Sequence, residues 1–110
     1  MTPSNLLANI PSRLDNEQFE PIAHKGSVTI ERILSRGHSS PAAGWYDAEE
    51  DEWVLLVEGE AILEFADGRQ HRLQRGDHLL IPAHCRHKVA WTPADQITVW
   101  LALHLPPAAN

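Results

Sequence analysis

Short apolar runs separated by turn-forming residues fill the chain from Val28 onward. They are rich in Val, Ile, Leu and Trp, and they recur at intervals of about 8 to 12 residues, which is typical of antiparallel sandwiches and barrels. The strands predicted from these runs are residues 27–35, 52–58, 61–66, 70–73, 78–81, 88–91 and 96–104. No helical period interrupts them, so we expect an all-β, antiparallel protein.

Two glycine turns divide the middle of the predicted barrel. Asp67-Gly68 predicts a two-residue hairpin, because both central residues of such a turn need positive φ and this pair tolerates it. Glu58-Gly59-Glu60 predicts a second tight corner. Hairpin connections of this kind favour neighbouring strands that run in opposite directions.

The length of 110 residues suits one domain with its own core. We expect a lead-in over residues 1–26, a barrel over 27–106 and a tail over 107–110. We expect the lead-in to be helical or irregular, with Ser4 and Ser12 as possible N-caps. We also expect it to pack against the outside of the barrel. Internal repeats and low-complexity segments are absent from the sequence.

Composition excludes several classes of function. The net charge is -6, and acids gather in residues 47–52, so a nucleic-acid partner is not expected. No run approaches the roughly 20 apolar residues of a membrane-spanning helix, and no secretion signal is recognised. The single cysteine, Cys85, cannot form an intramolecular disulfide, which favours the reducing cytoplasm.

The run 52–58 is apolar on both of its faces. If Glu52 points inward, Val54 and Leu56 do the same, because side chains alternate along a strand. The residues that point the other way are Trp53, Leu55 and Val57. This outer face needs a cover, either the N-terminal segment or a second copy of the chain. With a second copy as the cover, we expect a homodimer.

Two spacings connect these strands to a possible site. Glu52 is followed after six residues by Gly59, and Gly76 is followed by Pro82 and then by His87. These residues resemble the paired motifs of the cupin superfamily, whose second motif places a proline and a histidine at these intervals after a glycine. The likeness covers roughly residues 28–105 and implies a double-stranded β-helix, or jelly-roll barrel.

The chain departs from the cupin motifs at four positions. Trp45 and Asp47 occupy the two histidine positions of the first motif, His84 replaces a glycine, and Trp91 stands where asparagine is common. The two tryptophans favour a pocket more apolar than is usual in the family. Its expected residues are Trp45, His84, Trp91 and His104.

The resemblance implies a divalent metal ion held, position by position, by Asp47, Glu52 and His87. One imidazole and two carboxylates suit Mn, Fe, Ni or Zn. Each residue has a structural alternative: Asp47 in a solvated acidic loop, Glu52 at an exposed strand start, and His87 as a buried structural histidine. His104 could line the pocket or face solvent.

Three functions follow from these alternatives. The first is a barrel that binds a divalent metal and a small organic ligand, as an enzyme of unassigned reaction. The second is a metal-free binding or sensor protein with an apolar pocket. The third is a dimeric structural protein without a ligand, based on the apolar outer face of residues 53–57. The family hosts many reactions, so the resemblance does not indicate one.

Overall fold

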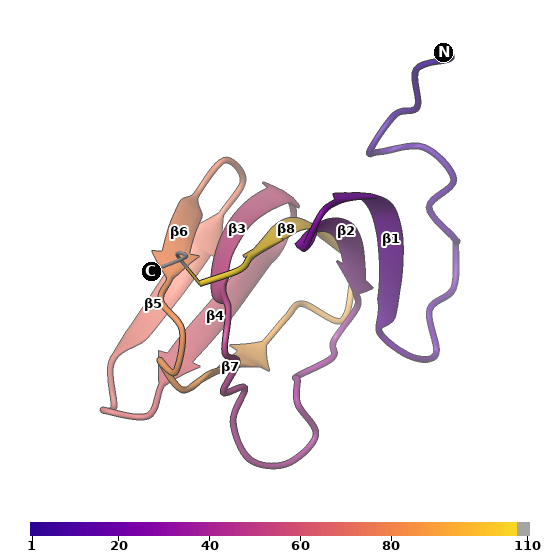
Figure 1. Ribbon diagram of the computed structural model, residues 1–110. Coiled ribbons are helices and arrows are strands. Elements are labelled where there is room, and N and C mark those ends of the chain that lie inside the picture. The colour runs from indigo at the N-terminus through magenta and orange to yellow at the C-terminus, as the bar shows by residue number, and fades with distance from the viewer. Residues whose placement is uncertain (108–110) are drawn as a thin grey trace.

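A computed structural model describes residues 1–107, and these contain eight β-strands (Figure 1). The strands are β1 (Gln18–Lys25), β2 (Val28–Ser35), β3 (Asp51–Glu58), β4 (Glu60–Phe65), β5 (Gln70–Gln74), β6 (His78–Ile81), β7 (His87–Trp91) and β8 (Thr98–Leu105). One sheet has the order β1-β2-β8-β3-β6, and the other has the order β5-β4-β7. Every pairing is antiparallel.

All seven predicted strands are confirmed, with boundaries displaced by two residues at most. The last one, predicted over 96–104, is observed as Thr98–Leu105. β8 lies between β2 and β3, which are its partners on either side although both precede it by many residues. Such non-sequential pairing is how a jelly roll closes its sheets.

The expectation for the N-terminal lead-in is wrong in part. Residues 1–107 contain no helix and therefore none that could cross a membrane, and residues 18–25 form β1 instead. This strand is exposed along most of its length, and Pro21 adjoins an irregularity in its pairing with β2. A solvated edge strand lacks the apolar alternation that sequence patterns detect, and its main-chain hydrogen bonds hold it in place.

The two predicted turns are present, although one differs in type. Phe65 and Arg69 are joined by a main-chain hydrogen bond of 2.8 Å, which leaves a three-residue loop. Within that loop only Gly68 has a positive φ, +95°. The Asp67-Gly68 hairpin therefore belongs to the three-residue class with one left-handed residue, not to the two-residue class.

Gly59 forms the corner between β3 and β4, which belong to different sheets. Its φ is +96°, and a Cβ added there would lie 2.8 Å from Thr98 Oγ1 and 2.9 Å from Thr98 Cα. The Thr98 hydroxyl donates a hydrogen bond of 2.9 Å to the carbonyl of Glu60. The close approach of β8 to this corner therefore requires glycine.

The main core fills the space between the two sheets. It combines apolar side chains that face inward from β3, β4, β5, β6 and β8: Val54, Leu56, Ala61, Leu63, Phe65, Leu73, Ile81, Trp100 and Ala102. Val54 and Leu56 lie in this core, as the alternation along β3 predicted.

A second apolar cluster lies on the outer face of the larger sheet. Leu14 of the N-terminal segment is buried there with Leu34 and Val99, and Ile10 and Val57 pack against them. The N-terminal segment therefore covers the outer face around Val57, which was one of the two covers expected from the sequence.

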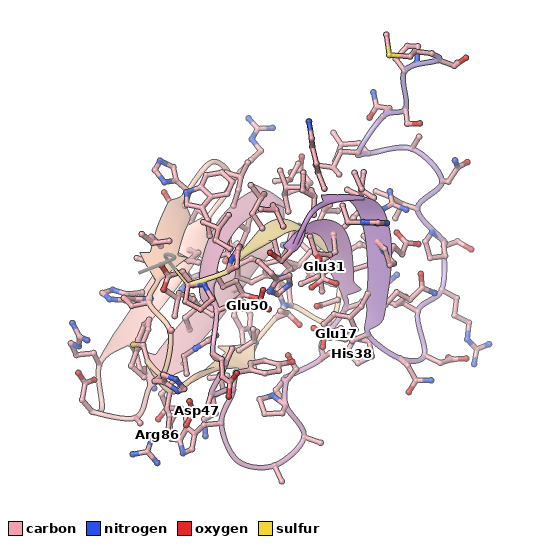
Figure 2. All side chains as sticks on the ribbon, viewed as in Figure 1. Glu17, Glu31, His38, Asp47, Glu50 and Arg86 are labelled. Atoms are coloured by element: carbon pink, nitrogen blue, oxygen red, sulfur yellow. The ribbon has the colours of Figure 1, made fainter. Side chains whose placement is uncertain are left out.

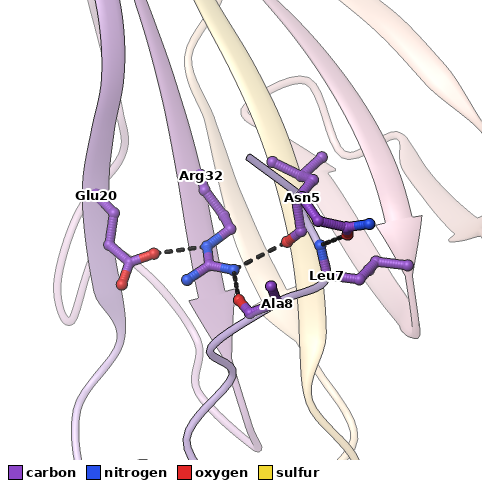
Figure 3. Close-up of polar contacts among 6 residues, drawn as sticks. Asn5, Leu7, Ala8, Glu20 and Arg32 are labelled. Atoms are coloured by element: carbon purple, nitrogen blue, oxygen red, sulfur yellow. Dashed lines mark hydrogen bonds and ion pairs between the residues drawn. The ribbon is translucent and has the colours of Figure 1, made fainter. Parts of the chain in front are cut away.

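Arg32 fastens the N-terminal segment to the sheet (Figure 3). Its guanidinium donates hydrogen bonds of 2.9 and 2.6 Å to the carbonyls of Leu6 and Ala8, and one of 2.6 Å to the Glu20 carboxylate. Arg32 is 8% exposed, so these charge-assisted bonds form in a largely dry setting. The segment is thus held by both apolar packing and a buried cation.

The Gly59 corner gives a first prediction. Gly59→Ala and Gly68→Ala introduce the same Cβ at nearly the same φ, but the position of Gly68 is open. We expect Gly68→Ala to lower the free energy of unfolding by about 1 kcal/mol, and Gly59→Ala to lower it by about 1–3 kcal/mol more, because of its clash with Thr98. Urea unfolding of both variants measures this difference, and equal losses would contradict it.

Arg32 gives a second prediction. Arg32→Met keeps the aliphatic stem and removes the bonds to Leu6 and Ala8, so trypsin should cleave after Arg13 roughly tenfold faster than in the parent protein. Arg69→Met, which removes an exposed arginine paired with Asp67, is the control. Unchanged cleavage after Arg13 in Arg32→Met would show that packing alone holds the segment.

Candidate functional site

A cavity of about 170 Å³ lies between the two sheets. Its walls are mainly apolar and come from both sheets: Ile33, Val54 and Trp100 from the larger, Leu63 and Val89 from the smaller. The register explains their direction, since Ile33 pairs with Trp100 and Leu63 pairs with Val89. A mainly apolar cleft or cavity with a few polar groups is the usual form of a small-molecule site.

Glu52 and His87 meet across this cavity. Glu52 lies on β3, where it pairs with His104 of β8, and His87 lies on β7 of the other sheet, where it pairs with Phe65. His87 Nε2 is 3.6 Å from Glu52 Oε1, and the His87 side chain is 8% exposed. The structure therefore brings together the two residues that carried the clearest spacings in the sequence.

The environment of His87 defines its protonation. Nδ1 lies 2.8 Å from the carbonyl oxygen of Cys85, which can only accept, so Nδ1 carries a hydrogen and Nε2 faces Glu52. Burial acts to lower the pKa of His87, but the Glu52 carboxylate and the Cys85 carbonyl outweigh it, and the pKa is raised above its usual 6.5. The site thus stabilises an imidazolium next to Glu52.

His104 extends this contact toward β2. Its Nε2 lies 2.7 Å from Glu31 Oε1 and therefore donates to that carboxylate, while its Nδ1 lies 3.5 Å from Glu52 Oε2. Glu31, His104, Glu52 and His87 thus form a continuous row of alternating acids and imidazoles, which we call the acid–imidazole chain. All four residues line the cavity.

The loop between β2 and β3 adds Ser40 and Tyr46 to the lining. Main-chain hydrogen bonds fasten this loop to β7: Ser40 bonds with Val89, and Tyr46 bonds with His87. The Tyr46 ring lies 5.6 Å from that of His87. Burial raises the pKa of Tyr46, an effect that the Ser40 side chain partly offsets, so the phenol is a neutral hydrogen-bond donor at neutral pH.

Asp47 and His84 lie outside the cavity. They form a pair with Asp47 Oδ1 3.0 Å from His84 Nδ1, and their side chains are 47% and 66% exposed. The expected grouping of Asp47 with Glu52 and His87 is therefore not found. His84 has a φ of +62°, so the turn keeps the left-handed conformation that glycine has in the family motif.

Trp45 and Trp91 do not line the cavity either. Trp45 packs under Lys88, whose Nζ is 4.5 Å from the ring centre, and Trp91 is 39% exposed beside Arg72. An irregularity in the pairing of β4 with β7 pairs Trp91 with Ile62, whereas Val89 pairs with the inward-facing Leu63. This bulge turns Trp91 away from the interior.

Sequence reasoning missed several lining residues. Glu31 shares a face of β2 with Ile33, and Trp100 shares a face of β8 with His104, so the two-residue period could have indicated them. Glu17 and Glu50 belong to irregular segments, and only tertiary structure brings them to the cavity (Figure 2).

The positions of the possible ligand side chains show whether the expected metal site could form. Within residues 1–107, no three His, Cys, Asp or Glu side chains are grouped so as to hold a metal. Asp47 pairs with His84 outside the cavity. The Trp45 indole has no lone pair with which to coordinate a metal ion. The expected three-residue metal centre of Asp47, Glu52 and His87 does not fit this arrangement.

Comparison with known proteins identifies relatives of this chain. A family model described as "Cupin domain" matches residues 31–104. A crystal structure of a putative mannose-6-phosphate isomerase from Ralstonia eutropha JMP134 is 42% identical, covers 97% of this chain and 100% of its own, and superposes with a TM-score of 0.90. A search of curated proteins found no match to the chain.

More distant structures share the fold. A cupin superfamily protein from Desulfitobacterium hafniense DCB-2 is 23% identical over 89% of this chain and 84% of its own, with a TM-score of 0.73. An RmlC-like cupin from Desulfovibrio desulfuricans is 19% identical over 98% and 99%, with a TM-score of 0.76. The match over most of the barrel and the close relative establish that this chain belongs to the cupin family.

Proposed function

We propose that this cupin is a binding barrel that takes a small organic molecule into the cavity without a resident metal ion. The observation that supports this function is a mainly apolar cavity whose polar groups gather in the acid–imidazole chain. Apolar walls would bury the body of the ligand, and Glu52, His87 and Tyr46 would orient its polar group. This was the second of the functions expected from the sequence.

If the protein is an enzyme, we propose that it catalyses a proton transfer on the bound ligand. His87 Nε2 and Glu52 lie close enough to pass a proton to and from a bound hydroxyl or carbonyl group. Proton transfer of this kind underlies many isomerisations, and the name of the Ralstonia relative includes that reaction class. A sugar phosphate is not proposed as substrate, because no lysine or arginine of residues 1–107 lines the cavity to bind a phosphate.

The homodimer and the cytoplasmic location stay predictions. The N-terminal segment covers the outer face at Val57, whereas Trp53 and Leu55 are half-buried there. We propose that a second copy of the chain packs against Trp53 and Leu55, which would make the protein a homodimer.

Benzyl alcohol is a suitable probe of the cavity, since an engineered apolar cavity of about 150 Å³ holds benzene. We expect saturable binding, measured by NMR shifts of the Trp100 indole. Ile33→Phe should weaken binding at least about tenfold by filling the cavity, whereas Ile22→Phe, the same change at a residue 50% exposed on β1, should not. Equal binding by both variants, or no binding by the parent, would contradict the proposal.

The metal ion implied by the family resemblance is tested separately. Elemental analysis of protein purified without chelators should give far less than one ion of Mn, Fe, Ni or Zn per chain. His87→Ala is analysed beside it, with circular dichroism as the control for folding. A stoichiometric metal that is lost in folded His87→Ala would overturn the metal-free proposal and restore a metal site at Glu52 and His87.

A further inference from the structure

The charge of the cavity lining carries an inference that rests on the proposed function and adds a ligand class to it. We infer that the cavity selects a small organic cation, an amine with an apolar body, over neutral and anionic molecules of the same shape. Four carboxylates line the cavity: Glu17, Glu31, Glu50 and Glu52. The cationic candidates facing them are His87 and His104, and the lining within residues 1–107 includes no lysine or arginine. Even with both imidazoles protonated, the lining keeps an excess of negative charge.

The contacts of these carboxylates show where a cation would bind. Glu31 already accepts from His104 at 2.7 Å, and Glu17 accepts a hydrogen bond of 2.6 Å from the neutral Ser35 hydroxyl. Both oxygens of Glu52 are 3.5–3.6 Å from histidine nitrogens, beyond the roughly 2.7–2.9 Å of a charge-assisted hydrogen bond. Glu52 can therefore accept a closer bond from an ammonium group.

The aromatic lining points independently to the same ligand class. Phe19, Tyr46 and Trp100 line the cavity, on β1, the β2–β3 loop and β8. An aromatic face attracts a cation placed within about 6 Å of its centre, and the attraction grows when both are desolvated. The three rings come from separated segments, so their gathering depends on the fold and not on a local run of sequence.

Size limits the body of this cation to about one ring. The cavity of about 170 Å³ compares with the roughly 150 Å³ that accommodates benzene in an engineered protein. The ring of a benzylammonium ion matches the apolar walls around Val54 and Trp100, and its three N–H donors match carboxylate oxygens at the polar end. The low dielectric of such a hollow strengthens this pairing relative to water.

Three probes of one shape test the inference: benzylammonium, benzyl alcohol and benzoate, titrated into the full chain at neutral pH and followed by NMR and calorimetry. We expect benzylammonium to bind about tenfold tighter than benzyl alcohol, and benzoate weakest of all. Glu52→Gln should reduce the preference for benzylammonium over benzyl alcohol severalfold. Glu58→Gln, at a carboxylate paired with Arg75 outside the cavity, should leave it unchanged. If Glu52→Gln fails to fold, Glu50→Gln serves as the second variant.

The outcomes separate this inference from the function on which it rests. Benzyl alcohol or benzoate binding as tightly as benzylammonium overturns the cation preference and leaves the binding function standing. Failure of all three probes to bind overturns both. A preference that survives Glu52→Gln and Glu50→Gln unchanged also overturns the inference, because it would arise away from these carboxylates.

Discussion

The pairing of β8 between β2 and β3 is the constraint on which the rest of the structure depends. It places Glu52 beside His104, and Ile33 beside Trp100, so that one row of side chains faces the smaller sheet. Because side chains alternate along a strand, a shift of one residue in this register would move all of them to the outer face. Gly59 permits the close approach of β8 to the corner between the sheets.

The smaller sheet and the β2–β3 loop complete the site from the opposite side. β7 carries His87 toward Glu52, and main-chain bonds from Ser40 and Tyr46 fasten the loop to β7. The site is therefore assembled from strands and from a pinned loop, which favours a preformed cavity. A preformed cavity loses less conformational entropy when it binds a ligand.

The departures from the cupin motifs have a common effect. The two first-motif histidine positions hold Trp45 and Asp47, and neither of these lines the cavity. Imidazole and carboxylate groups enter instead from other strands, as His104 of β8 and Glu31 of β2. The interior of this cupin is thus acidic and aromatic, without a positively charged arginine or lysine among the described lining residues. The proposed ligand therefore differs in charge from the phosphorylated sugar in the name of the Ralstonia relative.

The sequence by itself determined seven of the eight strands and the positions of two turns, because strand alternation and glycine turns are local properties. The meeting of Glu52 with His87 was expected from the motif spacings shared with the cupins. It could not place Asp47, His84, Trp45 or Trp91, since each lies in a loop or beside a bulge whose direction depends on distant partners. β1 escaped detection because an exposed edge strand is held by main-chain bonds and not by an apolar pattern. Glu17 and Glu50 lie in irregular segments, and only the tertiary fold brings them to the cavity. The charge of the cavity was therefore decided by the tertiary structure, because it depends on which distant carboxylates the sheets bring together.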